Sequence, residues 1–162
     1  LLATSCRVGG IVADLPREQV EALTTFGRSF GMAFQIVDDL LDVTSTDEEL
    51  GKPAGHDLVE GTYTLPVIRT LAAGGDTARD LEALLGRLRP IDGSFEPVDD
   101  PATLAEAREL LRGGAAVQTS LDTARRYVED GQIALAPYTG TEAAGALRAA
   151  ADHLLASVRA AA

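Results

Sequence analysis

The feature that most constrains the fold of this chain is residues 34–42, which read Phe-Gln-Ile-Val-Asp-Asp-Leu-Leu-Asp. Three aspartates lie here inside one of the most apolar stretches of the sequence. Burying an unpaired carboxylate is expensive, so we expect a cation to compensate these charges. On an α-helix, at about 100° per residue, four polar residues fall within an arc of roughly 100° and can converge on one point. They are Gln35, Asp38, Asp39 and Asp42.

The preceding residues extend the same helical pattern. Gly27 and Gly31 project onto the acidic face, whereas Phe30, Val37 and Leu41 form an apolar stripe. A glycine inside a helix costs roughly 0.5–1 kcal/mol relative to alanine, so we interpret the glycines as space beside the carboxylates for a ligand. The alternative is that they admit a neighbouring helix and that the aspartates form a solvated face.

A lysine follows on a segment with loop signals. Gly51, Pro53 and Gly55 surround Lys52 and indicate an irregular loop. Lysine pairs well with phosphate oxygens, and Mg²⁺ prefers one or two carboxylates together with substrate phosphates. The carboxylates and the lysine together predict a site for Mg²⁺ and a diphosphate.

Three ordered segments resemble the trans-isoprenyl diphosphate synthases (polyprenyl synthetases), around the second aspartate-rich motif of that family. The segments are residues 31–42 (GMAFQIVDDLLD), 51–57 (GKPAGHD) and 60–66 (EGTYTLP). One departure is Thr62, where the family often has a lysine. The resemblance implies a partial isoprenoid synthase fold, with residues 1–162 forming the carboxy-terminal part of one domain.

The resemblance also implies roles for individual residues. The metal ligands would be Asp38 and Asp42, with Asp39 beside them and Asp57 supporting the metal cluster. The substrate-binding residues would be Phe34, Gln35 and Lys52. Lys52, which would contact the diphosphate, and Gln35 are the candidate catalytic residues.

The implied activity is Mg²⁺-dependent head-to-tail condensation of isopentenyl diphosphate with an allylic diphosphate, by an enzyme that usually forms homodimers. We do not find the family's first aspartate-rich motif or its basic isopentenyl diphosphate segment in the sequence, which starts at Leu1 as if cut inside a helix. We therefore expect a carboxy-terminal half that is inactive alone. Two other functions stay open: a metal-dependent diphosphate lyase like the terpene cyclases, and a non-catalytic helical subunit of a heteromeric synthase.

Composition favours an all-α helix bundle. Hydrophobic residues make up 46% of the chain but aromatic residues only 4%, so the core must consist mainly of Leu, Ala, Val and Ile. No apolar stretch approaches the ~18 residues of a membrane span, and we expect a cytoplasmic protein. The net charge of −11 argues against a nucleic-acid partner.

Helical periodicity and breaker residues predict seven helices, near residues 1–13, 17–45, 64–73, 76–88, 102–112, 115–136 and 141–160. Residues 90–101 predict a surface loop. We interpret its pair Asp99-Asp100 as part of a turn and helix cap rather than a metal site.

Overall fold

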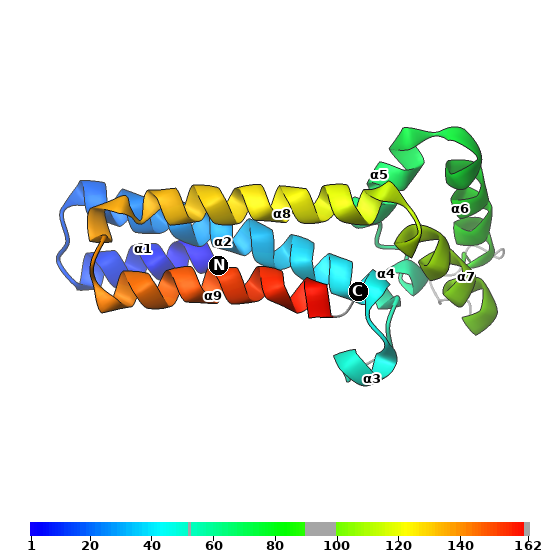
Figure 1. Ribbon diagram of the computed structural model, residues 1–162, viewed down its shortest axis with the longest axis horizontal. Helices are drawn as coiled ribbons and strands as arrows, with labels where there is room; N and C mark the ends of the chain where they lie inside the picture. The colour runs from blue at the N-terminus through cyan, green and yellow to red at the C-terminus, as the bar shows by residue number, and fades with distance from the viewer. Residues whose placement is uncertain (52, 90–99, 161–162) are drawn as a thin grey trace. The chain divides into compact units, whose positions relative to one another are not determined.

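A computed structural model describes residues 1–51, 53–89 and 100–160 of the chain (Figure 1). Within these ranges the regular structure is helical and no strand occurs, which confirms the predicted all-α class. The chain divides into two compact units. The first contains Leu1–Val37 and Leu121–Ala160, and the second contains Asp38–Ser120. That residues 1–162 belong to a single domain stays a prediction.

All seven predicted helices are present close to their expected bounds. They are α1 (Leu2–Val12), α2 (Arg17–Thr44), α5 (Leu65–Ala73), α6 (Gly75–Arg87), α7 (Pro101–Arg112), α8 (Ala115–Ala134) and α9 (Glu142–Ala160). The sequence patterns did not predict three short elements, which are α3 (Asp47–Leu50), α4 (His56–Val59) and the 3₁₀ turn η1 (Ala136–Tyr138). Helices this short carry too few residues to show an apolar period.

In the first unit, α1, α9 and the parts of α2 and α8 that belong to it lie side by side (Figure 1). The contact between α1 and α2 is close at Gly27. A Cβ atom there would lie 2.6 Å from the Leu2 carbonyl oxygen and 2.8 Å from Cys6 Sγ. Gly27 therefore admits a neighbouring helix, and our interpretation of this glycine as space for a ligand is wrong.

Polar contacts join other helices of this unit. Gln132 Nε2 on α8 donates to Asp152 Oδ1 on α9 at 2.8 Å. The hydroxyl group of Tyr138, on η1, donates to the carbonyl oxygen of Gln19 near the start of α2, also at 2.8 Å. Desolvation raises the pKa of the Tyr138 hydroxyl above its usual value, so the hydroxyl keeps the proton that it donates.

In the second unit, α5, α6 and α7 pack around an aliphatic core. Its buried members are Val43, Leu58, Val67, Leu81, Leu84, Leu85, Leu88, Ala107 and Leu111. Asp100 is the N-cap of α7 and its Oδ1 accepts a hydrogen bond from Thr103 N at 3.0 Å, which confirms the helix-cap interpretation for this residue. The rest of the predicted loop, residues 90–99, lies outside the described residues.

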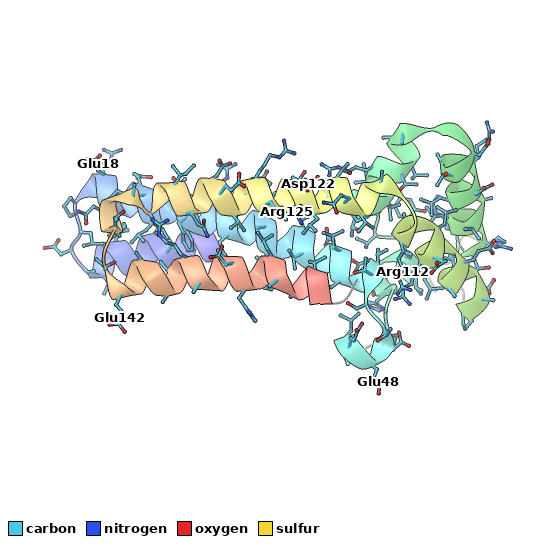
Figure 2. The ribbon with its side chains drawn as sticks, in the orientation of Figure 1. Glu18, Glu48, Arg112, Asp122, Arg125 and Glu142 are labelled. Atoms are coloured by element: carbon cyan, nitrogen blue, oxygen red, sulfur yellow. The ribbon has the colours of Figure 1, made fainter. Side chains whose placement is uncertain are left out.

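The acidic excess is carried by exposed side chains. Glu18, Glu48 and Glu142 point away from the helices that carry them (Figure 2), and all three residues are exposed. Carboxylates in such positions keep their hydration. None of the described helices has the length and apolar character needed to cross a membrane.

Candidate metal and diphosphate site

The three aspartates of the predicted motif lie on the last two turns of α2 and differ in burial. Asp38 is exposed and Asp39 is half-buried, whereas Asp42 is only 4% exposed. Asp38 and Asp42 are four residues apart, so their Cβ atoms lie about 5–6 Å apart on the same side of the helix. The helix therefore presents one solvent-accessible and one buried carboxylate as neighbours.

Asp42 has an unusual hydrogen-bonding state for a buried carboxylate. Its Oδ2 accepts a hydrogen bond from the backbone N–H of Asp57 at 3.3 Å. Its Oδ1 is buried and has no hydrogen-bond partner among the residues that the structure describes. A buried acceptor without a partner costs ~1–3 kcal/mol, and more when charged. A cation at Oδ1 would remove this cost, so the residue fits a metal ligand.

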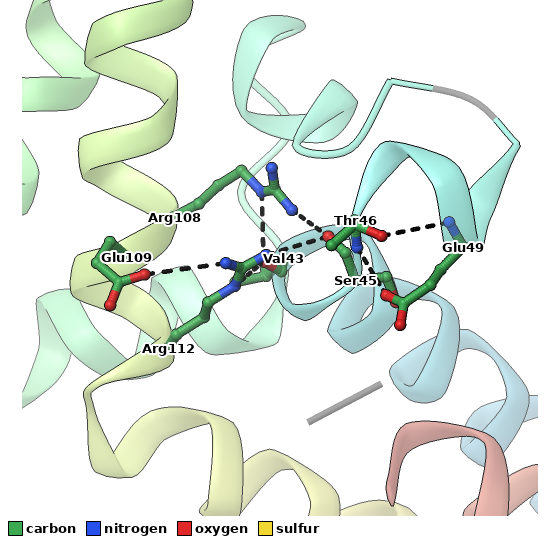
Figure 3. Close-up of polar contacts among 7 residues, drawn as sticks. All are labelled: Val43, Ser45, Thr46, Glu49, Arg108, Glu109 and Arg112. Atoms are coloured by element: carbon green, nitrogen blue, oxygen red, sulfur yellow. Dashed lines mark hydrogen bonds and ion pairs between the residues drawn. The ribbon is translucent and has the colours of Figure 1, made fainter. Parts of the chain in front are cut away.

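The loop after α2 is fixed at both ends. Thr46 and Glu49 form a capping box, in which Thr46 N donates to Glu49 Oε2 at 2.8 Å and Glu49 N donates to Thr46 Oγ1 at 3.3 Å (Figure 3). At the other end, Ala54 N donates to Asp47 Oδ1 at 2.8 Å. Lys52 lies between these fixed points, but the residue itself is outside the described part of the chain.

The other predicted site residues are placed as follows. Phe34 and Gln35 lie on α2 in the first unit and are both exposed, with Phe34 at 49%. Asp57 is half-buried at the start of α4, and its backbone N–H donates a hydrogen bond to the carboxylate of Asp42. Across the described ranges, no three His, Cys, Asp or Glu side chains come close enough to hold a metal together.

Sequence reasoning missed two arginines of α7, Arg108 and Arg112. Both donate hydrogen bonds to the carbonyl oxygens of Val43 and Ser45, at the end of α2 (Figure 3). The only available signal was their spacing, since residues four apart lie on the same side of a helix. Nothing in the sequence indicates which segment they contact.

A pocket of about 510 Å³ lies between this loop and α7. The residues that line it include Asp47, Pro53, His56, Asp100, Leu104 and Arg108. The three aspartates of α2 are not among its lining residues, so the pocket is distinct from the carboxylates of the motif.

Gly55 provides a test of how tightly this loop is held. It adopts a φ of +80°, and an added Cβ would lie 2.7 Å from Arg108 Cδ and 2.9 Å from Leu104 Cδ1. Strain and crowding are each worth ~1–3 kcal/mol, so we expect Gly55→Ala to lower the free energy of unfolding by about 2–4 kcal/mol in urea titrations.

Gly51→Ala is the matched control. Gly51 also has a positive φ, of +66°, but no described atom lies within 4 Å of an added Cβ. We expect this variant to lose only about 1–2 kcal/mol, the cost of the left-handed conformation. Equal losses in the two variants would show that α7 does not press against Gly55.

Comparison with known proteins finds similar sequences over most of the chain. A sequence model of the family described as polyprenyl synthetase matches residues 1–93. The chain is 35% identical over 148 residues to heptaprenyl diphosphate synthase component 2 of Geobacillus stearothermophilus, covering 91% of this chain and 42% of that protein. It is 35% identical over 153 residues to nonaprenyl diphosphate synthase of Mycobacterium tuberculosis, covering 94% of this chain and 43% of that protein.

Solved structures give the same result. The polyprenyl synthase of Caulobacter crescentus, complexed with calcium and isoprenyl diphosphate, matches with a TM-score of 0.82 and 33% identity, over 95% of this chain and 44% of that one. The geranylgeranyl pyrophosphate synthase of Corynebacterium glutamicum, also complexed with calcium and isoprenyl diphosphate, matches with a TM-score of 0.81 and 31% identity, over 96% of this chain and 46% of that one. The predicted isoprenoid synthase fold is thus confirmed. The chain spans less than half the length of these proteins.

Proposed function

The chain belongs to the polyprenyl synthetase family, and we propose that it supplies the carboxy-terminal half of a polyprenyl diphosphate synthase. The observation that carries this proposal is Asp42, a buried carboxylate one helical turn from the exposed Asp38. Its Oδ1 has no hydrogen-bond partner among the residues that the structure describes. The proposed substrates are isopentenyl diphosphate and an allylic diphosphate. A homodimer and a cytoplasmic location stay predictions.

In this proposal Asp38 and Asp42 hold Mg²⁺, with Asp39 beside them and Asp57 fixing Asp42 through its backbone N–H. Bound Mg²⁺ would neutralise charge on the diphosphate leaving group, and a site of two carboxylates plus substrate phosphates suits this ion. Calcium in two of the matching structures supports a divalent cation as the cofactor. The protein must keep these carboxylates charged and in place, and the hydrogen bonds around Asp42 serve that purpose.

The other proposed residues act on the substrates. The positive charge of Lys52 stabilises the negative charge on the leaving diphosphate. Phe34 and Gln35 line the space for the prenyl groups. The carbon–oxygen bond of the allylic diphosphate breaks, the double bond of isopentenyl diphosphate forms the new carbon–carbon bond, and a proton leaves. None of these steps requires a nucleophilic side chain from the protein.

The direct test is an assay on the complete synthase that carries this sequence. Radiolabelled isopentenyl diphosphate, an allylic diphosphate and Mg²⁺ are mixed, and extended prenyl products are separated by chromatography. We expect extended product that is lost on adding EDTA. Pyrophosphate release from the allylic substrate without incorporation of isopentenyl diphosphate would instead indicate a lyase. Activity that appears only with a second, different subunit would indicate a heteromeric synthase.

Lys52 is the only lysine in the sequence, which allows a selective test of its proposed contact. The experiment uses the 162-residue chain. We expect Mg²⁺ and inorganic pyrophosphate together to slow acetylation of Lys52 by an amine-directed reagent, measured by mass spectrometry. The amino group of Leu1 is the internal control and should react at an unchanged rate. Equal acetylation of Lys52 with and without pyrophosphate would contradict the contact.

In the complete synthase, Lys52→Ala removes this contact without removing a metal ligand. A hydrogen bond to a charged group is worth ~1.5–3 kcal/mol, so we expect kcat/KM for the allylic substrate to fall about ten- to a hundredfold. A large part of this loss should be a rise in KM, as measured by steady-state kinetics. An unchanged kcat/KM would remove Lys52 from the site.

A further inference from the structure

Two arginines of α7 hold the C-terminal end of α2 (Figure 3). The last four carbonyl groups of an α-helix have no partner within the helix. Arg108 Nε and Arg112 Nε donate to the carbonyl oxygen of Val43 at 3.3 and 3.1 Å. The Nη2 atoms of both arginines donate to the carbonyl oxygen of Ser45, at 3.1 Å from Arg112. Two guanidinium groups thus converge on the end of the helix that carries the aspartates.

Asp42 immediately precedes Val43 and is itself held by the loop. The backbone N–H of Gly55 donates to the Asp42 carbonyl oxygen at 2.9 Å, and that of Asp57 donates to its Oδ2 at 3.3 Å. The carbonyl groups of Asp42 and Val43 are consecutive in the chain. A movement that breaks the arginine contacts of Val43 therefore also moves Asp42.

Arg108 contacts the loop as well as the helix. An added Cβ on Gly55 would lie 2.7 Å from Arg108 Cδ and 3.4 Å from Arg108 Cγ, so the arginine stem packs directly against the Gly55 backbone. The guanidinium group of this side chain holds the end of α2, and its stem supports the loop residue that bonds Asp42. One side chain thus fixes both parts of the structure around Asp42.

We infer that Arg108 and Arg112 are positioning residues, which fix the Asp42 carboxylate and the base of the Lys52 loop for metal and diphosphate binding. The inference rests on the proposed function, because it takes Asp42 as a metal ligand. In this inference the arginines bind neither the metal nor the substrate. Their effect passes through the carbonyl groups of Val43 and Ser45.

Arginine suits this role because of its shape. Its planar guanidinium group presents several N–H donors in a fixed fork, whereas lysine has one compact ammonium group. Burial lowers the pKa of Arg108 and the charge of Arg112 lowers it further, while Asp47 and Asp42 raise it. An arginine nevertheless stays charged in a protein. Replacement by lysine therefore keeps the charge near Asp42 and removes the fork, which separates geometry from charge.

The first experiment measures the contacts of Asp42 directly in this chain. Amide hydrogen exchange at Gly55 and Asp57 is followed by NMR in the unaltered protein and in Arg108→Lys and Arg112→Lys. We expect exchange at both amides to accelerate by about tenfold or more in each variant, the loss expected when one charge-assisted bond fails. Unchanged exchange in both variants would overturn the inference. If Arg108→Lys does not fold, Arg112→Lys alone decides.

Arg87→Lys is the matched control. Arg87 on α6 forms an exposed ion pair with Glu106 on α7, at 2.9 Å, and takes no part in the hydrogen bonds to Val43 and Ser45. The substitution makes the same change of side chain at an exposed contact between α6 and α7. It leaves the hydrogen bonds to the carbonyl groups of α2 in place. Accelerated exchange at Gly55 and Asp57 in this variant would show a general loosening of α7 and would overturn the specific role of the arginine pair.

The second experiment uses the complete synthase and Mg²⁺ as the titrated ligand. Residues that orient metal ligands typically change metal affinity by 10–100-fold, so we expect Arg108→Lys to raise the half-saturating Mg²⁺ concentration by about tenfold. The KM for isopentenyl diphosphate should not change, and Arg87→Lys should behave like the unaltered enzyme. Full retention of Mg²⁺ affinity in Arg108→Lys and Arg112→Lys would overturn the inference.

Failure of the inference is distinguishable from failure of the proposed function. If Asp42→Ala abolishes turnover while the lysine variants leave exchange and Mg²⁺ affinity unchanged, the arginines are not positioning residues and the proposed function stands. If Asp42→Ala leaves turnover unchanged, the proposed metal site is wrong and the inference falls with it.

Discussion

Replacing Asp38 with alanine in the complete synthase is expected to lower kcat by roughly a hundred- to a thousandfold, the range seen when one stabiliser of transition-state charge is lost. The physical reason is that Asp38 is the solvent-accessible member of the carboxylate pair. Its removal takes away one of the two proposed ligands of the metal that stabilises the leaving diphosphate. Because the interaction strengthens as the diphosphate leaves, the loss should fall on kcat rather than on KM alone. Steady-state kinetics over a range of Mg²⁺ concentrations measure it.

Asp80→Ala is the control for this prediction. Asp80 is an exposed aspartate on α6, outside the motif, so its removal changes the net charge equally without affecting the proposed ligands. We expect its kcat to stay near that of the unaltered enzyme. Near-normal kcat in Asp38→Ala at ordinary Mg²⁺ would mean that the aspartates form a solvated helix face.

The 162-residue chain alone is expected to give no extended product above background. It contains one Asp-Asp-x-x-Asp motif, at residues 38–42, whereas the family resemblance implies two motifs and a separate basic segment for isopentenyl diphosphate. Orientation of two substrates is worth several kcal/mol of the activation barrier, and a protein that holds only one substrate loses that contribution. Incubation of the chain with both diphosphates and Mg²⁺, followed by product analysis, measures this.

Supplying the amino-terminal half of the synthase as a second polypeptide is the positive control. We expect the mixture to recover extension activity, because the missing groups then return to the site. Robust turnover by the 162-residue chain alone would show that the catalytic groups have been assigned to the wrong residues.

Helical periodicity was a good guide to the long elements of this fold. The apolar stripe with Phe30, Val37 and Leu41 predicted α2 and its ends closely, because a long amphipathic helix repeats its pattern many times. The short helix α3 was missed, although Thr46 and Glu49 have the spacing of a capping box. A capping-box spacing indicates the start of a helix, so Thr46 and Glu49 were the sequence signal that could have predicted α3.

Contacts between distant segments could not be predicted in the same way. The sequence placed Asp38, Asp39 and Asp42 on one helix, but only Asp42 of the three is buried, and its Oδ2 accepts a hydrogen bond from Asp57, fifteen residues later. Arg108 bonds a carbonyl group 65 residues earlier, and no local pattern reports such a partner.

Gly27 shows the limit of reasoning from a single helix. A glycine on a helix face indicates a close approach, but the pattern does not say whether a ligand or another helix approaches. In this protein α1 does so, through Leu2 and Cys6.

The most direct test of the metal-binding role of α2 is a crystal structure of the complete synthase with Mn²⁺ and inorganic pyrophosphate. Anomalous scattering at the manganese edge locates the metal without reference to the protein. We expect Mn²⁺ at about 2.0–2.2 Å from carboxylate oxygens of Asp38 and Asp42, with pyrophosphate oxygens completing its coordination. An anomalous peak elsewhere, with Asp42 Oδ1 still unpaired, would contradict the account.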